Sequence, residues 1–330
     1  MRDFKKPFKE MGRMLLFLLI LTGLLAGLSR QVMEIAKHND GLVQERNKTL
    51  VKLQNEEEDS IDVLFLGDSL GYTSFSPLQM WKEQGFTSYA GCQSGQMINE
   101  TYAMLEAAFE TQSPKLVVLE TNTIFRDSGD LFGIRQMISE KLNSYFPIFR
   151  FHNIWKPMLL GPKYGEMTYK GFLIRSTVVA YKGKNYMEKN DKKREISDGI
   201  RMYMERMIEL CRENDARLML VSVPSPVNYN DQKHRALAEY AKENQLDYVD
   251  LNLELEKLDI DWAADTMDGG DHPNLTGARK ISSYMGAHLK EAYGLPDHRE
   301  DESYASWNKE ADEYEQQIAS EQKIMAASVR

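Results

Sequence analysis

The stretch from Ile61 to Leu70 constrains the fold of this chain more than any other. Its apolar run, Val63–Leu66, is short and unbroken, which is typical of a strand in a parallel sheet that is covered on both faces. Gly67-Asp68-Ser69 follows at once, so a serine hydroxyl stands where the strand ends. Open α/β sheets bind their ligands at that edge. Ser69 is therefore a candidate nucleophile, although Gly-Asp-Ser is also common in ordinary turns, because Asp and Ser bond nearby backbone groups.

Apolar runs and amphipathic segments alternate along the rest of the chain. Further strands are predicted at 87–90, 116–119, 218–223 and 248–251. Helices are predicted at 97–109, around 200–211, at about 231–244 and at 276–293. This alternation predicts one α/β domain of three layers, with a central parallel sheet of about five strands between helices. The chain is 42% apolar, which is ample for such a core.

The charge and the cysteines narrow the function classes. A net charge of -9 gives no electrostatic reason to expect a nucleic-acid partner, since such binding depends on clustered Lys and Arg. Cys92 and Cys211 make neither a disulfide framework nor a zinc site. Cys211 falls on the apolar stripe of a predicted helix, so we expect it to be a small buried hydrophobe.

The amino terminus has the composition of a membrane segment. Residues 1–13 are basic, and residues 14–29 carry no charge. Sixteen residues is short for a span of about 30 Å, so a cleaved signal peptide competes with a retained signal-anchor, which we favour. The basic flank should stay in the cytoplasm, with everything after Arg30 extracytoplasmic. The expected location is the cell membrane, crossed once.

The sequence suggests four regions beyond the anchor. Residues 30–57 are polar and predict a helical stalk. The α/β domain is expected at 58–295, and 296–330 is a charged tail in which Trp307 and Tyr314 should pack back on the domain. Within the domain, about 124–195 is rich in aromatic and basic residues and interrupts the alternation. A structureless loop of that length is improbable, so this interval predicts a folded insertion beside the site.

A second informative stretch lies near the end of the domain. Asp268-Gly269-Gly270-Asp271-His272-Pro273-Asn274 is a glycine-rich loop with one histidine between carboxylates and the last predicted core helix. Together with strand-Gly-Asp-Ser-Leu, this Asp/His-Pro-Asn pattern resembles the SGNH/GDSL hydrolase superfamily. The resemblance covers roughly Asp62 to Tyr293, without the insertion.

The resemblance implies a catalytic serine site. A serine hydroxyl needs an imidazole to take its proton, and the imidazole needs a carboxylate to orient it. Ser69 and His272 match the superfamily's nucleophile and base. The superfamily's Asp-x-x-His spacing would put the carboxylate at Gly269, so either Asp268 or Asp271 must serve here; we lean to Asp268, because adjacent side chains tend to point apart.

The resemblance also implies an oxyanion hole. The superfamily uses the backbone N–H of the serine, a glycine after the second strand and an asparagine after the third. Here these are Ser69, Gly95 and Asn122. Glu120 replaces the glycine that normally precedes that asparagine, so this block departs from the pattern.

These features predict acyl transfer through an acyl-serine, with no metal or organic cofactor. Similar anchored proteins add or remove O-acyl groups on cell-surface polymers. We therefore expect a membrane-anchored O-acylesterase or O-acyltransferase whose partners are a surface glycan or cell-wall polymer, the lipid bilayer and a multi-spanning membrane acyltransferase. The alternative is a non-catalytic surface protein that keeps the fold to bind glycan or to scaffold an acylation complex.

Overall fold

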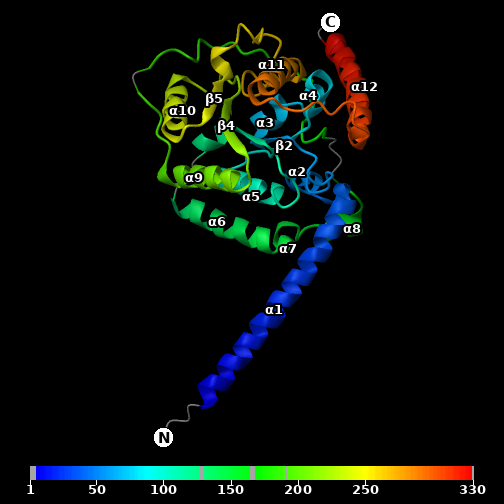
Figure 1. Cartoon of the computed structure of the whole chain (residues 1–330), viewed down its shortest axis with the longest axis vertical. Coiled ribbons are helices and arrows are strands. Elements are labelled where there is room, and N and C mark those ends of the chain that lie inside the picture. The colour runs from blue at the N-terminus through cyan, green and yellow to red at the C-terminus, as the bar shows by residue number, and fades with distance from the viewer. Residues whose placement is uncertain (1–4, 127–129, 164–167, 191, 329–330) are drawn as a thin grey trace.

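Five parallel strands form the sheet that the apolar runs predict. They are β1 (Val63–Gly67), β2 (Ser88–Cys92), β3 (Leu116–Glu120), β4 (Arg217–Ser222) and β5 (Asp247–Asp250), in the order β2-β1-β3-β4-β5 (Figure 1). This computed structural model describes residues 5–126, 130–163, 168–190 and 192–328. Residues 1–4 of the predicted basic tail lie outside it. The predicted fold class, a central parallel sheet between helices, is confirmed.

Both faces of the sheet are buried. Leu64 and Leu66 of β1 belong to one apolar cluster, whereas Val63 and Phe65 belong to the other. Successive side chains of a strand point to opposite faces, so an unbroken apolar run is what a doubly covered strand requires. The same alternation recurs in β3 and β4.

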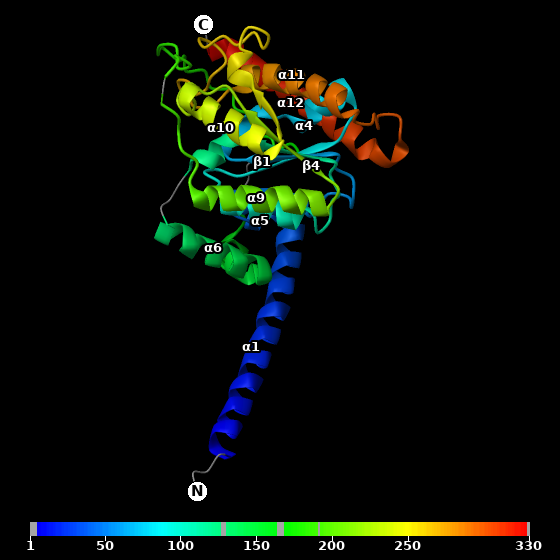
Figure 2. The ribbon, with the colours of Figure 1, turned by 60° about the vertical axis from the view of Figure 1, so that its left-hand side comes forward.

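Helices cover the two faces. One cluster includes residues of α5 (Ile98–Ala108), α9 (Asp198–Glu213) and α10 (Asp231–Asn244); the other includes α3 (Ser69–Ser74), α4 (Pro77–Gln84) and α11 (Leu275–Tyr293). Figure 2 shows α5 and α9 on one side of the sheet and α4 and α11 on the other. Cys211 of α9 is buried in the first cluster, as its position on the apolar face of the predicted helix indicates.

The amino-terminal helix leads directly into the domain. Helix α1 (Lys5–His38) contains a segment, Lys9–His38, that is long and apolar enough to cross a membrane. A 3-10 turn, η1 (Asp40–Leu42), and helix α2 (Glu45–Leu53) follow. Leu50 and Leu53 of α2 are buried in the cluster that covers the sheet. The region expected to be a stalk therefore includes a helix packed on the domain, and α1 is joined to the domain without an extended spacer.

The interval between β3 and β4 has two parts. The first contains η2 (Thr121–Phe125), α6 (Asp130–Tyr145), α7 (Pro147–Arg150) and α8 (Trp155–Leu160). Helix α6 packs against α5, and α7 packs against α1. In the second part, the described residues before α9 form no helix and only one isolated bridge, Tyr169 with Phe172.

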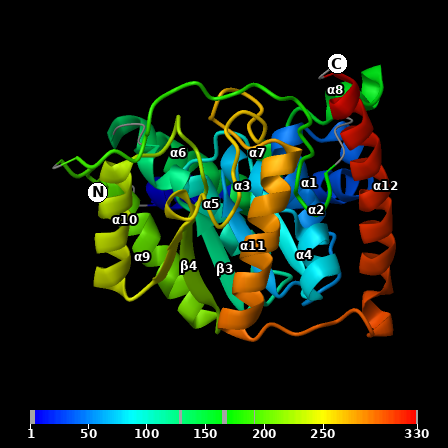
Figure 3. The same ribbon diagram turned by 90° about the horizontal axis from the view of Figure 1, so that it is seen from above.

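The carboxy-terminal segment packs along one side of the domain. After β5 come η3 (Leu251–Leu253) and α11, and the tail then forms η4 (Glu302–Tyr304) and α12 (Ala305–Ser328). Helix α12 lies beside α4 (Figure 3). Trp307 and Tyr314 are buried there, and Ser76 Oγ donates a hydrogen bond of 2.7 Å to Tyr314 Oη. The tail is thus part of the folded body.

Replacing the buried ring of Tyr314 should destabilise the whole domain. Tyr314→Ala removes a fully buried aromatic side chain, and such truncations cost about 3–5 kcal/mol. Lys309→Ala on the exposed face of α12 is the matched control, and its effect should stay within about 0.5 kcal/mol. Denaturant unfolding of the detergent-solubilised chain measures both. Equal stabilities would mean that α12 does not contribute to the cooperative core.

Candidate active site

Ser69 stands at the start of the helix that follows β1. The strand ends at Gly67, and Asp68 caps α3 by accepting a hydrogen bond of 2.9 Å from the Leu70 N–H. A short side-chain acceptor at this position satisfies a backbone N–H that lacks a helical partner. Ser69 is the first residue of α3 and is largely buried. The cap fixes the direction in which α3 leaves the sheet and so positions the serine.

The histidine loop is folded back on itself. Thr266 and Pro273 form an isolated bridge, and the Met267 N–H donates to the carbonyl of His272 at 3.1 Å. Between them, Gly269 and Gly270 have φ of +78° and +99°. Glycine adopts such angles without steric cost. These two residues turn the chain so tightly that residue 268 returns beside residue 272.

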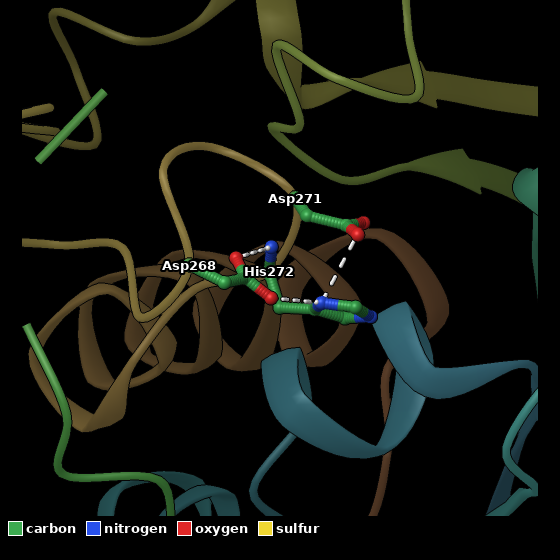
Figure 4. Close-up of side chains that lie close together, drawn as sticks. All are labelled: Asp268, Asp271 and His272. Carbon is green, nitrogen blue, oxygen red and sulfur yellow. Dashed lines mark hydrogen bonds and ion pairs between the residues drawn. The ribbon is translucent and has the colours of Figure 1, made fainter. Parts of the chain in front are cut away.

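Three side chains form a hydrogen-bonded line. Ser69 Oγ lies 2.8 Å from His272 Nε2, and His272 Nδ1 lies 2.7 Å from Asp268 Oδ2. The other oxygen of Asp268 accepts the His272 backbone N–H at 2.7 Å (Figure 4). A proton on Nδ1 donated to Asp268 leaves Nε2 as the acceptor for the serine hydroxyl. This is the arrangement that serine-histidine-carboxylate chemistry needs.

Asp271, the other candidate carboxylate, has a different partner. One of its oxygens lies 3.5 Å from His272 Nδ1, and that same oxygen accepts a hydrogen bond from Asn228 Nδ2. Figure 4 shows Asp268 and Asp271 approaching the same ring nitrogen of His272 from different directions. The backbone carbonyl of Asp271 also accepts a hydrogen bond from Ser225 Oγ at 2.7 Å. Asp271 is therefore held by the loop after β4, and Asp268 makes the short bond to the imidazole.

The same three residues are a geometric candidate for a cation site. One ligand atom each of Asp268, Asp271 and His272 lies within 4.8 Å of the others. However, both ring nitrogens of His272 already have partners, Asp268 on one side and Ser69 on the other. An ion at Nδ1 would have to replace the bond to Asp268. The hydrogen-bonding pattern therefore fits a triad better than a metal centre.

An extended segment ties the serine helix to the histidine loop. We call residues Leu173–Tyr181 the strap. Its Leu173 N–H donates to the carbonyl of Tyr72 in α3 at 3.0 Å, and its Val179 N–H donates to the carbonyl of Thr266 at 3.0 Å. The Gly269 N–H in turn donates to the carbonyl of Val179 at 2.9 Å. The second half of the predicted insertion thus lies beside the site and holds its two loops together.

Asp68 connects the serine to the third strand. Its Oδ2 accepts hydrogen bonds from Asn122 Nδ2 at 2.8 Å and from Arg126 Nε at 2.6 Å. Asp68 is fully buried, and a buried carboxylate is costly unless it is paired and hydrogen-bonded. The Arg126 guanidinium supplies the opposite charge. One hydrogen of the Asn122 amide is therefore directed at Asp68, and the second remains for another acceptor.

Glu120 occupies the position at which the superfamily has glycine. It is buried, and its Oε1 accepts the Asn122 backbone N–H at 3.0 Å. Its Oε2 has no hydrogen-bond partner among the described residues. Burial, and then the neighbouring Asp68, raise the pKa of Glu120 well above its usual range. A Cβ on Gly67 would lie 2.7 Å from the Cβ of Glu120, so glycine at 67 makes room for it.

Gly95 lies in the loop that follows β2. Cys92 pairs with Gly67 across the two strands, and the Gln93 N–H donates to the carbonyl of Gly67 at 3.3 Å. The loop after β2 therefore starts beside the loop that carries Ser69. Gly95 itself has φ of +60°, which favours glycine at this position.

Sequence reasoning did not identify Arg126 and Asn228 as site residues. Arg126 stands shortly after Asn122, and Asn228 follows a Pro-Ser-Pro segment at the end of β4. Both come from loops at the carboxyl edge of the sheet, where a search of every strand end for polar residues could have found them.

This chain resembles some known proteins in fold alone. No protein-family model matches it, and no curated protein matches it. Solved structures of similar fold include three bacterial proteins. The first is a proposed acylhydrolase from Bacteroides fragilis; it is 15% identical, the match covers 73% of this chain and 94% of that chain, and the TM-score is 0.38. The second is a proposed lipolytic protein of the G-D-S-L family from Desulfitobacterium hafniense; it is 13% identical, the match covers 68% of this chain and 97% of that chain, and the TM-score is 0.37. The third is a GDSL-like lipase from Bacteroides thetaiotaomicron; it is 15% identical, the match covers 80% of this chain and 99% of that chain, and the TM-score is 0.36.

These similarities are likenesses to solved structures at 13–15% sequence identity. At such low identities and TM-scores they carry no information on substrate or activity. Only the geometry of the site bears on the reaction.

Glu120→Gln should change how stability depends on pH. Glu120 binds its proton more tightly in the folded chain than in the unfolded chain, so its contribution to stability falls as pH rises above the unfolded value of about 4.3. Glutamine does not titrate and still accepts the Asn122 N–H. The variant should therefore gain unfolding free energy over the unaltered protein as pH rises. Thermal unfolding between acid and neutral pH measures this, with Glu313→Gln on exposed α12 as the control. If the difference in unfolding free energy between Glu120→Gln and the unaltered protein does not vary with pH, the raised pKa of Glu120 is contradicted.

Proposed function

We propose that this protein is a membrane-anchored, extracytoplasmic serine O-acylesterase or O-acyltransferase. Its substrate would be a surface glycan or cell-wall polymer. The enzymatic part of the proposal is carried by one observation, the line of short hydrogen bonds from Ser69 through His272 to Asp268. Two loops far apart in the sequence meet in that line, at the ligand-binding edge of a parallel sheet.

The geometry supports a two-step reaction. His272 Nε2 takes the proton of Ser69 as Oγ attacks the ester carbonyl, and Asp268 stabilises the imidazolium that forms. The protonated imidazole then gives that proton to the leaving alkoxide, which leaves an acyl-serine. In the second step His272 removes a proton from water or from a sugar hydroxyl, and that oxygen attacks the acyl carbon. The bond between the acyl carbon and Ser69 Oγ then breaks, and His272 returns the proton to Oγ. Esterase and transferase differ only in the acceptor.

The oxyanion donors follow from the same loops. The Ser69 N–H is in the first turn of α3, where backbone donors lack helical partners. The Gly95 N–H and the second hydrogen of the Asn122 amide are the other proposed donors. The bond from Asn122 to Asp68 would fix the amide in place before substrate arrives. Fixed donors favour the charged tetrahedral state over the ground state.

The proposed location and substrate rest on α1. Its uncharged run follows a basic flank, which favours a cytoplasmic amino terminus and an external domain. An external O-acyl hydrolase or transferase would meet cell-surface polymers. A multi-spanning membrane acyltransferase could supply acyl groups from the other side of the bilayer, and it is the proposed partner.

Ser69→Ala should abolish ester hydrolysis. Loss of the nucleophile removes the acyl-serine route, and we expect the rate of p-nitrophenyl acetate cleavage to fall by about a thousandfold or more. The unaltered protein, Ser69→Ala and the control Ser283→Ala are assayed as full chains in detergent. Ser283 lies on α11, outside the hydrogen-bonded line of Ser69, His272 and Asp268. Equal rates for the unaltered protein and Ser69→Ala would favour the rival function, a glycan-binding or scaffolding protein that keeps the fold. Phosphonate labelling at a residue other than Ser69 would contradict the assignment.

Asp268→Asn and Asp271→Asn should separate the two carboxylates. Asp268 makes the short bond to Nδ1, so its amide variant favours the wrong tautomer and should lower kcat by about 100- to 10,000-fold. Asp271 is more distant from the ring and bonds Asn228, so its amide variant should lose less than about tenfold. Steady-state hydrolysis of the same ester measures both. The opposite order would make Asp271 the orienting residue.

A further inference from the structure

Helix α6 carries a stripe of exposed apolar side chains that continues into α7. Ile138, Leu142, Tyr145 and Phe149 are 53%, 45%, 73% and 42% exposed. The three in α6 follow one another at spacings of four and three residues, which places them on one side of the helix. We call these four residues the apolar stripe. Exposed apolar groups gathered in this way mark an interaction surface.

Ion pairs join α6 to α5 and α7. Lys141 Nζ pairs with Glu106 of α5 at 3.1 Å, and Arg150 of α7 pairs with Glu140 of α6 at 2.7 Å. Among the side chains of α6 that the structure describes, the large apolar ones are exposed. This is the reverse of a helix that contributes its apolar side to a core.

The stripe lies where α1 leaves the domain. The Ile148 N–H of α7 donates to Ser29 Oγ of α1 at 3.3 Å, and Ser29 is the last residue of the uncharged run. Figures 1 and 2 both show α6 on the side of the domain from which α1 projects, running crosswise to α1. In a bilayer crossed by α1, helix α6 would therefore lie along the membrane plane.

The length of the uncharged run fits this placement. Sixteen residues of helix measure about 24 Å at 1.5 Å per residue, which is about 6 Å less than the hydrocarbon thickness of about 30 Å. Interfacial amphipathic helices enter the boundary between headgroups and acyl chains by about 5–10 Å. The apolar stripe lies at the level of Ser29, where the uncharged run of α1 ends. It would therefore occupy the outermost part of the hydrocarbon layer, which the uncharged run is too short to reach.

We propose that the apolar stripe is embedded in the outer leaflet of the bilayer that α1 crosses. This inference rests on the anchoring proposed above and goes beyond it. The aromatic rings of Tyr145 and Phe149 suit the membrane interface, where such side chains are enriched. Trp155 and Lys156 of α8 are also exposed and follow closely in the sequence. With two attachments and no spacer, the domain is held at a fixed height and orientation above the lipid.

The test places a fluorescent probe on the stripe and asks whether lipid reaches it. Leu142→Cys and Lys309→Cys are each labelled with an environment-sensitive dye in the full chain, which is then reconstituted into phosphatidylcholine–phosphatidylglycerol vesicles. Lys309 on α12 is the control, because α12 lies on another side of the domain from α6. The native Cys92 and Cys211 are buried, so the introduced thiol is the reactive one. Spin-labelled lipids in the vesicles act as quenchers.

We expect a blue-shifted emission and loss of most of the fluorescence at position 142, and neither at position 309. Flotation of the vesicles is measured on the same samples. If the chain floats but the probe at 142 is unquenched, the embedding is wrong and the anchor stands. A blue shift without lipid quenching would mean that a second copy or another protein covers the stripe, which also overturns the inference. A chain that does not float at all would remove the anchor and the embedding together.

Discussion

The burial of both faces of a parallel sheet is the constraint on which the rest of this structure depends. Because helices occupy both faces, polar chemistry is confined to the loops at the strand ends. All five strands run in the same direction, so their carboxyl ends lie at one edge. The loop that holds Ser69 and the loop that holds His272 meet there, although 203 positions separate them. The site is thus a consequence of topology before it is one of sequence motif.

At this edge of the sheet, the negative charge of a buried carboxylate is balanced by a neighbouring cation. The fully buried Asp68 has Arg126 as its ionic partner and Asn122 as a second donor, so loops after β1 and β3 are joined through one carboxylate. Removing either partner would leave part of that charge uncompensated. Burial raises the pKa of Glu120 well above its usual range, and the neighbouring charge of Asp68 raises it further. The serine therefore sits on a network whose members depend on one another.

Much of this fold and part of the site could be predicted from the sequence. Two strands are predictable from unbroken apolar runs, at Val63–Leu66 and at 116–119, because a strand that is buried on both faces has apolar residues at every position. Ser69 and His272 are recognisable because their neighbours form motifs. The choice between Asp268 and Asp271 depends on two glycine φ angles, which a residue list does not contain.

Other features are formed by contacts between distant parts of the chain. Asp68 and Arg126 are 58 residues apart, and Asn228 and Asp271 are 43 apart. No local periodicity reports such pairs. The strap is hidden for a related reason: it is held by backbone hydrogen bonds to Tyr72 and Thr266, and backbone groups leave no signature in the order of side chains.

The two departures from the superfamily pattern each have a compensation in the structure. The extra residue between Asp268 and His272 would misplace the carboxylate in a loop of ordinary angles, but Gly269 and Gly270 turn the chain back and restore a 2.7 Å bond. Glu120 is far larger than the glycine it replaces, but Gly67 leaves space for it, and its Oε1 supports the Asn122 backbone. With both adjustments in place, the hydrogen-bonded line from Ser69 through His272 to Asp268 is intact, which the proposed acyl transfer requires.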